Sequence, residues 1–220
     1  MPKSPQHYVS PNFTTEKLKA PTYEDIVDVF EDRMRHWMLE PAKQLLLQKH
    51  GYVAAVSILI GYFEGIEIFH AGEDSDRQSK TFFKRGYKRV FASASGPEYV
   101  QSAIAAELYS KLRCGFAHDG LFRNPVVFST IRKEAFFITW PKKKGAFDPK
   151  GKLTSAIVNP HRFCEGIFEH FDSYVQKLRA GIDQDLKRRF LAAIAIKWRL
   201  GEPGPYIAIT EEAFLRGGVS

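Results

Sequence analysis

The chain has 220 residues and is 44% hydrophobic, which is enough for one sizeable core. Its formal net charge of +7 favours polyanionic partners. Two cysteines cannot make a disulfide framework, and the first residues lack the pattern of a signal peptide, so we predict a cytoplasmic protein. The most apolar run, residues 52–63, is too short to cross a bilayer and predicts a buried helix, with no membrane partner.

The chain divides into three predicted parts. Residues 1–21 carry four prolines and little apolar periodicity, so we predict an extended N-terminal arm. Residues 22–200 combine helical periodicity with turn signals and predict a single, mainly α domain, a bundle of four or five helices with a small β insert. Residues 201–220 are a C-terminal tail, in which residues 206–210 predict one short strand.

Helical patterns fill the first half of the domain. Thr22 is suited to cap a helix that runs to about residue 40. Pro41 fits the first position of the next helix, which leads through Gly51 into the apolar helix of residues 52–70. These last two are either separate helices or one helix with a bend at Gly51. The inward positions expected in the first helix are Ile26, Val29, Phe30, Met34 and either Trp37 or Met38.

Two carboxylates, Glu64 and Glu67, lie within the apolar helix, where an unpaired charge is costly. A pairing group is therefore expected there. One interpretation is that Glu64 orients Arg113 from a neighbouring helix, and the other is that it lies on the solvent side or caps a turn. His70, near the end of the same helix, is interpreted as a helix-end cation.

Residues 77–91 predict a strongly basic helix with Phe83, Tyr87 and Val90 at helical spacing. Its basic face either lies along the phosphate backbone of RNA, with counterion release at each contact, or is a solvated face that balances the acidic loop before it. The candidate RNA-binding residues are Lys80, Lys84, Arg85, Lys88 and Arg89.

Residues 98–120 predict one long amphipathic helix. Ser95 and Pro97 are suitable start signals, and Gly120 is a suitable stop. The apolar face repeats at every fourth position, through Val100, Ile104, Leu108, Leu112 and Phe116.

Arg113 and His118 lie near the C-terminal end of this helix. Five steps along a regular helix separate their directions by roughly 140°, so the two side chains do not stack. They converge only if the last turn loosens, which Gly115 allows, or if a second copy of the helix completes the site.

The segment LRCGFAHDGLFRN, an Arg followed after four residues by a His near a helix end, resembles the motif of the HEPN superfamily. The resemblance covers about residues 22–200 in architecture and about a dozen residues in motif. Many members are metal-independent endoribonucleases that work as dimers, and members commonly serve in bacterial defence and toxin systems. This chain departs from the pattern at Cys114, because many active members have a polar residue directly after the Arg.

The resemblance implies an HEPN-like bundle that cleaves RNA without a metal or other cofactor. In that chemistry the ribose 2′-OH attacks the adjacent phosphate, with His118 as the base and Arg113 as the cation for the growing charge. Glu64 and Cys114 are supporting residues. The implied partners are RNA, a second copy of the chain and an antitoxin or effector protein. The alternative is a non-catalytic HEPN-like module that binds RNA or another protein.

Beyond Gly120 the pattern changes to β-branched and aromatic residues. Residues 126–131 and 136–140 predict a hairpin, and residues 153–158 predict a third strand. The whole insert therefore spans about residues 126–158.

Two helices complete the predicted domain. Asn159-Pro160 is a strong helix start, and Gly181 ends that helix. A last helix is expected from about residue 183 to residue 200.

Other chemistries have little support. The seven histidines form no HExxH pattern and the cysteines have no CxxC partner, so we expect no metal site. Neither GxGxxG nor a P-loop occurs. Cys114 is either a thiol nucleophile activated by the adjacent Arg113 or a packed helical cysteine.

Overall fold

The computed structural model describes residues 8–92, 98–120, 122–123, 126–131, 133–139, 142–143, 146–147 and 154–198. This part of the chain is mainly helical with small sheets, which confirms the predicted fold class. The start signals at Ser95 and Pro97 and the predicted tail and strand beyond residue 200 lie outside the described residues.

The N-terminal helices form one long rod. It consists of α1 (Tyr23–Arg33), a π-helical turn (Met34–Leu39) and α2 (Glu40–Leu46). The predicted restart at Pro41 is therefore a wide turn within a continuous helix. The wide turn lies just before Pro41 because this residue has no N–H for a regular helical hydrogen bond and its ring needs extra room.

Particular side chains fix the start of the rod and pack its wide turn against the core. Thr22 caps α1 as predicted: its hydroxyl accepts from the Asp25 N–H at 3.2 Å, and the Asp25 carboxylate accepts from the Thr22 N–H at 2.9 Å. Of the two alternatives for the inward position, Met38 packs against the core, whereas Trp37 is 56% exposed.

The described part of the N-terminal arm packs against this rod. It comprises β1 (Tyr8–Ser10), β2 (Phe13–Thr14) and a 3₁₀ turn (Thr15–Leu18). Asn12 donates to the Asp32 carboxylate of α1 from its main-chain N–H at 2.8 Å and from its side chain at 2.6 Å.

Two apolar helices follow, α3 (Tyr52–Leu59) and α4 (Tyr62–Ala71), and then the basic helix α5 (Ser79–Val90). A turn over residues 47–51 separates α2 from α3, so they are two helices and not one bent helix. By length and composition the segment Tyr52–Ala71 is apolar enough to cross a membrane, but 56% of its apolar window is buried inside the protein. A core helix of a soluble protein passes the same test.

The long helix predicted over residues 98–120 comprises α6 (Glu98–Glu107), a second π-helical turn (Leu108–Arg113) and α7 (Cys114–Asp119). Gly120 ends it with a left-handed φ of 68°, a conformation that glycine adopts without a Cβ penalty. Ile104, Leu108 and Leu112 of the apolar face are buried, whereas Val100 is partly buried and Phe116 is 41% exposed.

The β insert contains a three-stranded sheet of β3 (Val126–Phe128), β4 (Phe136–Thr139) and β7 (Ser155–Val158), and a separate pair, β5 (Lys142–Lys143) and β6 (Ala146–Phe147). The strand order is β3-β7-β4, so the predicted hairpin pairing of the first two strands is wrong, while the third strand is confirmed. The last strand takes the centre because it carries two buried side chains, Ala156 and Val158.

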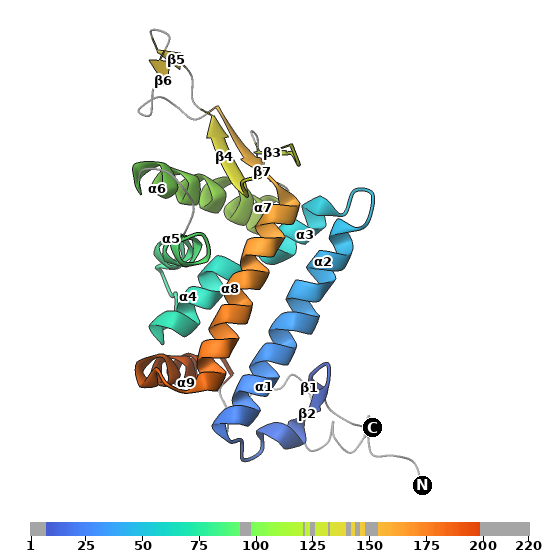
Figure 1. Ribbon diagram of the computed structural model, residues 1–220, viewed down its shortest axis with the longest axis vertical. Coiled ribbons are helices and arrows are strands. Elements are labelled where there is room, and N and C mark those ends of the chain that lie inside the picture. The colour runs from blue at the N-terminus through green and yellow to red at the C-terminus, as the bar shows by residue number, and fades with distance from the viewer. Residues whose placement is uncertain are drawn as a thin grey trace.

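The chain closes with α8 (Pro160–Ala180) and α9 (Gln184–Trp198). Asn159 caps α8 and Gly181 ends it, as predicted. Figure 1 shows α8 beside the α1–α2 rod, with α4, α5 and α6 on its other side and α9 next to α4. Aromatic side chains fill the space between these layers: the Phe30 ring contacts the rings of Phe69, Phe171, Tyr174 and Phe190.

Two histidines lie against this core. The His70 ring lies 5.7 Å from the His170 ring and 4.6 Å from the Tyr174 ring. Burial, with Arg89 and Lys177 nearby, lowers the pKa of His70 to about 3 and that of His170 to about 4. The prediction that His70 is a helix-end cation is therefore wrong, because its buried ring is neutral at pH 7.

We expect acid to destabilise the fold through this pair. Both folded-state pKa values lie below the ordinary value of 6.5, so the unfolded chain binds more protons and stability falls between pH 6.5 and about 4. Each histidine contributes at most about 1.4 kcal/mol per pH unit. Urea unfolding at pH 7, 6 and 5 measures the slope, and His70→Phe should make it shallower. An equally steep fall in that variant would contradict the assignment.

Candidate functional site

Arg113 ends the second π-helical turn and pairs with a carboxylate on another helix. Its Nη2 lies 3.0 Å from Glu64 Oε2 of α4. Their side chains are 29% and 15% exposed, so the guanidinium is held in place and remains open to solvent on one side. Of the two interpretations of Glu64, the structure has the one in which it contacts Arg113.

Glu64 is itself held by two hydroxyls that sequence analysis did not single out. Ser75 Oγ donates to Oε1 and Ser79 Oγ donates to Oε2, both at 2.8 Å. The Tyr109 hydroxyl donates to Ser79 Oγ at 3.2 Å. This network joins α4, the following loop, α5 and the long helix of Arg113, and it fixes the guanidinium as a supporting shell fixes a functional group. The sequence signal was weak, because these hydroxyls lie in and just after a polar loop.

His118 lies in the last turn of α7, and its side chain is exposed. The wide turn ends at Arg113 and the helix is regular from Cys114 to Asp119, so it does not loosen at Gly115. Arg113 and His118 therefore keep directions roughly 140° apart on the helix. Because the last turn does not loosen, Arg113 and His118 can converge only if a second copy of the helix completes the site.

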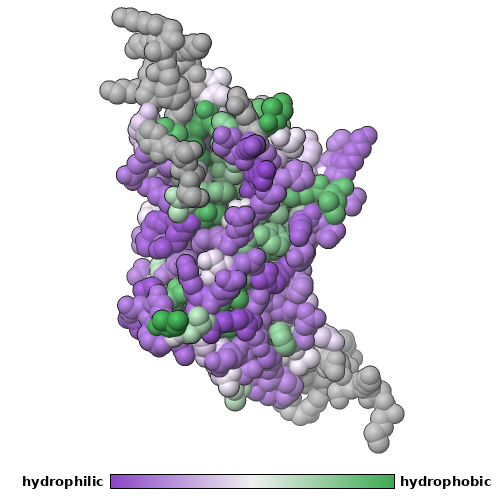
Figure 2. All heavy atoms as spheres, in the orientation of Figure 1, coloured by the Kyte–Doolittle hydropathy of each residue, from purple (hydrophilic) through white to green (hydrophobic). Residues whose placement is uncertain are grey.

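Aromatic rings extend from α7 across this end of the molecule. Phe116, Phe122, Phe128 and Tyr52 form a row with ring centroids 5.9, 5.6 and 5.3 Å apart. Phe116 is 41% and Tyr52 is 40% exposed. Figure 2 shows a largely hydrophilic face with an apolar patch where α2 and α3 meet, and Leu47 there is 73% exposed. Exposed apolar surface of this kind is typical of protein interfaces.

The basic helix α5 balances acidic groups elsewhere in the fold. Glu67 of α4 is fully buried and pairs with Arg85 at 2.8 Å and with Arg89. Lys88 pairs with Glu98 at 2.9 Å. Two of the five candidate RNA-binding residues thus neutralise one buried carboxylate, which supplies the partner that Glu67 was expected to need.

Lys80 and Lys84 are the two candidates for which we see no ion pair with another described residue. If α5 binds RNA, reversing both to Glu should weaken binding and reduce the slope of log affinity against log salt by about 2, because two phosphate contacts are lost. Filter binding at several salt concentrations measures the slope. An unchanged slope would mean that RNA binds elsewhere.

The same reversal at Arg85 and Arg89 is not an equivalent test. It leaves the buried Glu67 carboxylate unpaired, which typically costs about 3–5 kcal/mol. Loss of binding in that variant would report unfolding, so the melting temperature has to be measured beside it.

Cys114 and the metal prediction complete the list of sequence candidates. Cys114 is a free thiol of intermediate burial beside Arg113. Among the residues that the structure describes, no group of three His, Cys, Asp or Glu side chains is placed to hold a metal ion. Neither of two cavities beside α8, of about 370 and 330 Å³, is lined by Arg113 or His118. Arg113 is 29% exposed and His118 is exposed, so both candidate residues lie at the surface.

Comparisons of this chain with protein-family models, curated proteins and solved structures find no match. The resemblance to the HEPN superfamily stays a prediction, carried by the motif and the helical architecture.

Proposed function

We propose that this chain is a cytoplasmic endoribonuclease that works as a homodimer, with Arg113 of one copy and His118 of the other at each site. The observation that carries the proposal is the Arg113–Glu64 pair, with its Nη2 to Oε2 distance of 3.0 Å. It presents a fixed cation that matches phosphate oxygens and stays charged at all working pH values.

The helix geometry supports a shared site. One copy directs Arg113 and His118 roughly 140° apart, whereas a two-fold axis near α7 would bring the histidine of one copy toward the arginine of the other. The aromatic row that begins at Phe116 of α7 gives such an axis an apolar contact surface, with Phe116 41% and Tyr52 40% exposed.

The chemistry needs no group beyond these side chains, the substrate and water. His118 takes the proton of the ribose 2′-OH, and the oxygen attacks the adjacent phosphorus. Arg113 stabilises the charge that develops on the phosphate oxygens. The bond from phosphorus to the 5′-oxygen of the next nucleotide breaks and this oxygen takes up a proton from water, so one product ends in a 2′,3′-cyclic phosphate and the other in a 5′-hydroxyl.

A second candidate has its own supporting observation. Because Arg113 is already neutralised by Glu64, the fold is also compatible with a non-catalytic module that binds RNA or protein through this surface. The two candidates differ in one measurement. Purified protein incubated with single-stranded RNA in excess chelator should yield cyclic-phosphate ends and leave DNA intact, and light scattering at micromolar concentration should give a dimer. Binding without cleavage would favour the module.

A further inference from the structure

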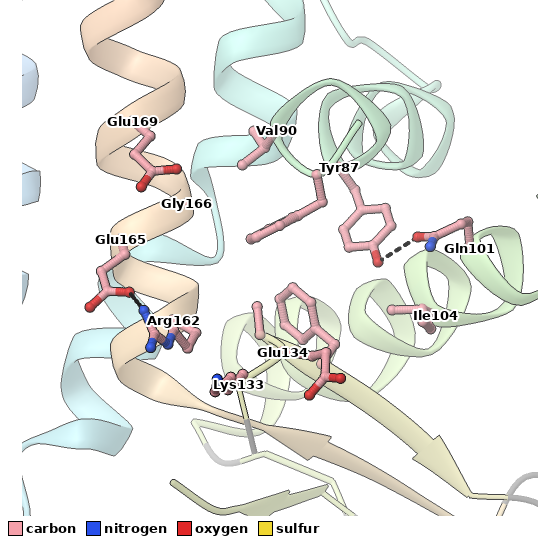
Figure 3. Close-up of a pocket in the computed structure, with 13 residues that line it drawn as sticks. Tyr87, Val90, Gln101, Ile104, Lys133, Glu134, Arg162, Glu165, Gly166 and Glu169 are labelled. Atoms are coloured by element: carbon pink, nitrogen blue, oxygen red, sulfur yellow. Dashed lines mark hydrogen bonds and ion pairs between the residues drawn. The ribbon is translucent and has the colours of Figure 1, made fainter. Parts of the chain in front are cut away.

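A cavity of about 370 Å³ lies away from the proposed site, between α5, α6, α8 and the turn before β4. Figure 3 shows Tyr87 and Val90 on one helix, Gln101 and Ile104 on another, and Glu165 and Glu169 on α8, with Lys133 and Glu134 at the turn. Its volume is within the range of small-molecule sites, about 300–1,000 Å³.

The floor of this cavity is aromatic. The Phe91 and Phe136 rings meet edge to face with centroids 5.1 Å apart. Tyr87 lies 5.6 Å from Phe91 and 5.7 Å from Phe136, and Ile104 is buried beside them. Tyr87 is 1% and Phe136 is 9% exposed, so a flat apolar ligand would contact mainly the partly exposed Phe91 ring.

Gly166 lies directly against one ring of this floor. A Cβ at this position would lie 2.6 Å from Cε1 of Phe91, so any other residue here would require the ring to shift. A glycine in the interior of a helix costs about 1 kcal/mol relative to alanine. This destabilising glycine is one of the residues that line the cavity.

The polar rim selects the charge of a ligand. Arg162 is paired with Glu165 at 2.6 Å, so these two charges cancel. The other charged lining residues are Lys133, Glu134 and Glu169, which leaves a net charge of −1 on a chain whose overall charge is +7. A local acidic rim over an aromatic floor is suited to an organic cation, which carboxylates and ring faces both attract.

From this arrangement we infer that the cavity binds a small molecule with a flat apolar body and a protonated amine. The inference is independent of RNA cleavage, because the lining includes neither Arg113 nor His118.

Three probes that share one ring system test this inference on the full chain: tryptamine, indole and indole-3-acetate. Calorimetry and ligand-observed NMR measure the affinity of each probe. The cation tryptamine should bind about tenfold more tightly than neutral indole, and the anion indole-3-acetate should bind most weakly. Failure of all three to bind would overturn the inference. So would an anion that binds as tightly as the cation.

Two variants locate the binding. The double variant Glu134→Gln, Glu169→Gln should bind tryptamine about tenfold more weakly and bind indole with unchanged affinity, because only the charge on the rim is lost. The matched control is Glu73→Gln, an exposed carboxylate on the loop after α4 that does not line the cavity. Equal tryptamine affinity in both proteins would overturn the assignment.

Gly166→Ala tests the floor, since its methyl group displaces Phe91 and should weaken tryptamine and indole alike. Gly65→Ala on α4 is the control, because a Cβ there meets no atom within 4 Å. Unchanged binding in a folded Gly166→Ala protein would place the ligand elsewhere. If that variant does not fold, the rim variants decide.

Discussion

Replacing His118 with alanine should lower RNA cleavage by about 10²- to 10⁴-fold, because a positioned general base is lost. Arg113→Ala should lower it by about 10²- to 10³-fold, because the developing charge loses its cation. Both rates are measured in excess chelator with a single-stranded RNA. Both proteins should stay folded, since His118 is exposed and Glu64 keeps its hydrogen bonds from two serines when Arg113 is removed.

Cys114→Ala is the control for these variants. It should remain active if the thiol is only packed, and a large loss of rate would instead indicate a thiol nucleophile. Full activity of His118→Ala, or cleavage by the wild type only with added metal, would contradict the enzyme proposal and leave the non-catalytic module.

Mixing the two inactive proteins tests whether the site is shared between copies. In a mixed dimer, the Arg113→Ala chain still supplies His118 and the His118→Ala chain still supplies Arg113, so one of its two sites is complete. With random exchange half of the dimers are mixed, and about a quarter of the wild-type activity should return. No recovery after proven subunit exchange would show that each site lies within one chain.

Gly86→Ala should be among the most destabilising single substitutions in this fold. Gly86 lies where α5 crosses α4, and a Cβ there would be 1.8 Å from the Phe63 carbonyl oxygen. The backbones of α4 and α5 must move apart to remove this clash, because a backbone oxygen cannot rotate away as a side chain can. Overpacking typically costs about 1–3 kcal/mol, and a clash with backbone belongs at the upper end of that range, so the melting temperature of a chain this long should fall by about 6–12 °C.

The control for this substitution lies on the same helix pair. Gly65→Ala on α4 meets no neighbouring atom and replaces a helical glycine, so it should raise stability by about 0.5–1 kcal/mol. Thermal unfolding of both variants measures the difference. A Gly86→Ala protein as stable as the wild type would mean that α4 and α5 are farther apart than described here.

The elements that sequence analysis predicted well are those with strong local signals. Thr22, Asn159 and Gly181 mark helix ends through side-chain capping or the left-handed glycine conformation, which depend on a few neighbouring residues. The strand order was missed because β3 and β4 each pair with β7, and such pairing depends on burial against the rest of the fold.

The candidate site was also predictable only in part. A carboxylate in an apolar helix requires a partner, so the need for ion pairs at Glu64 and Glu67 followed from the sequence. Which cations supply them did not, because Arg85 and Arg89 look equally suited to bind phosphate until the buried carboxylate beneath them is seen. The π-helical turn before Arg113 was also unpredictable, since it leaves no local sequence signal.

That wide turn amounts to one extra residue in an otherwise regular helix. In a regular helix the nine steps from Ile104 to Arg113 would put their directions about 180° apart, whereas a wide turn that absorbs one step leaves them about 80° apart. The extra residue is therefore what lets one helix direct Ile104 into the core and Arg113 toward Glu64. Deleting one residue within Leu108–Arg113 should restore a regular helix and keep both directions, whereas inserting one should turn Arg113 away from Glu64.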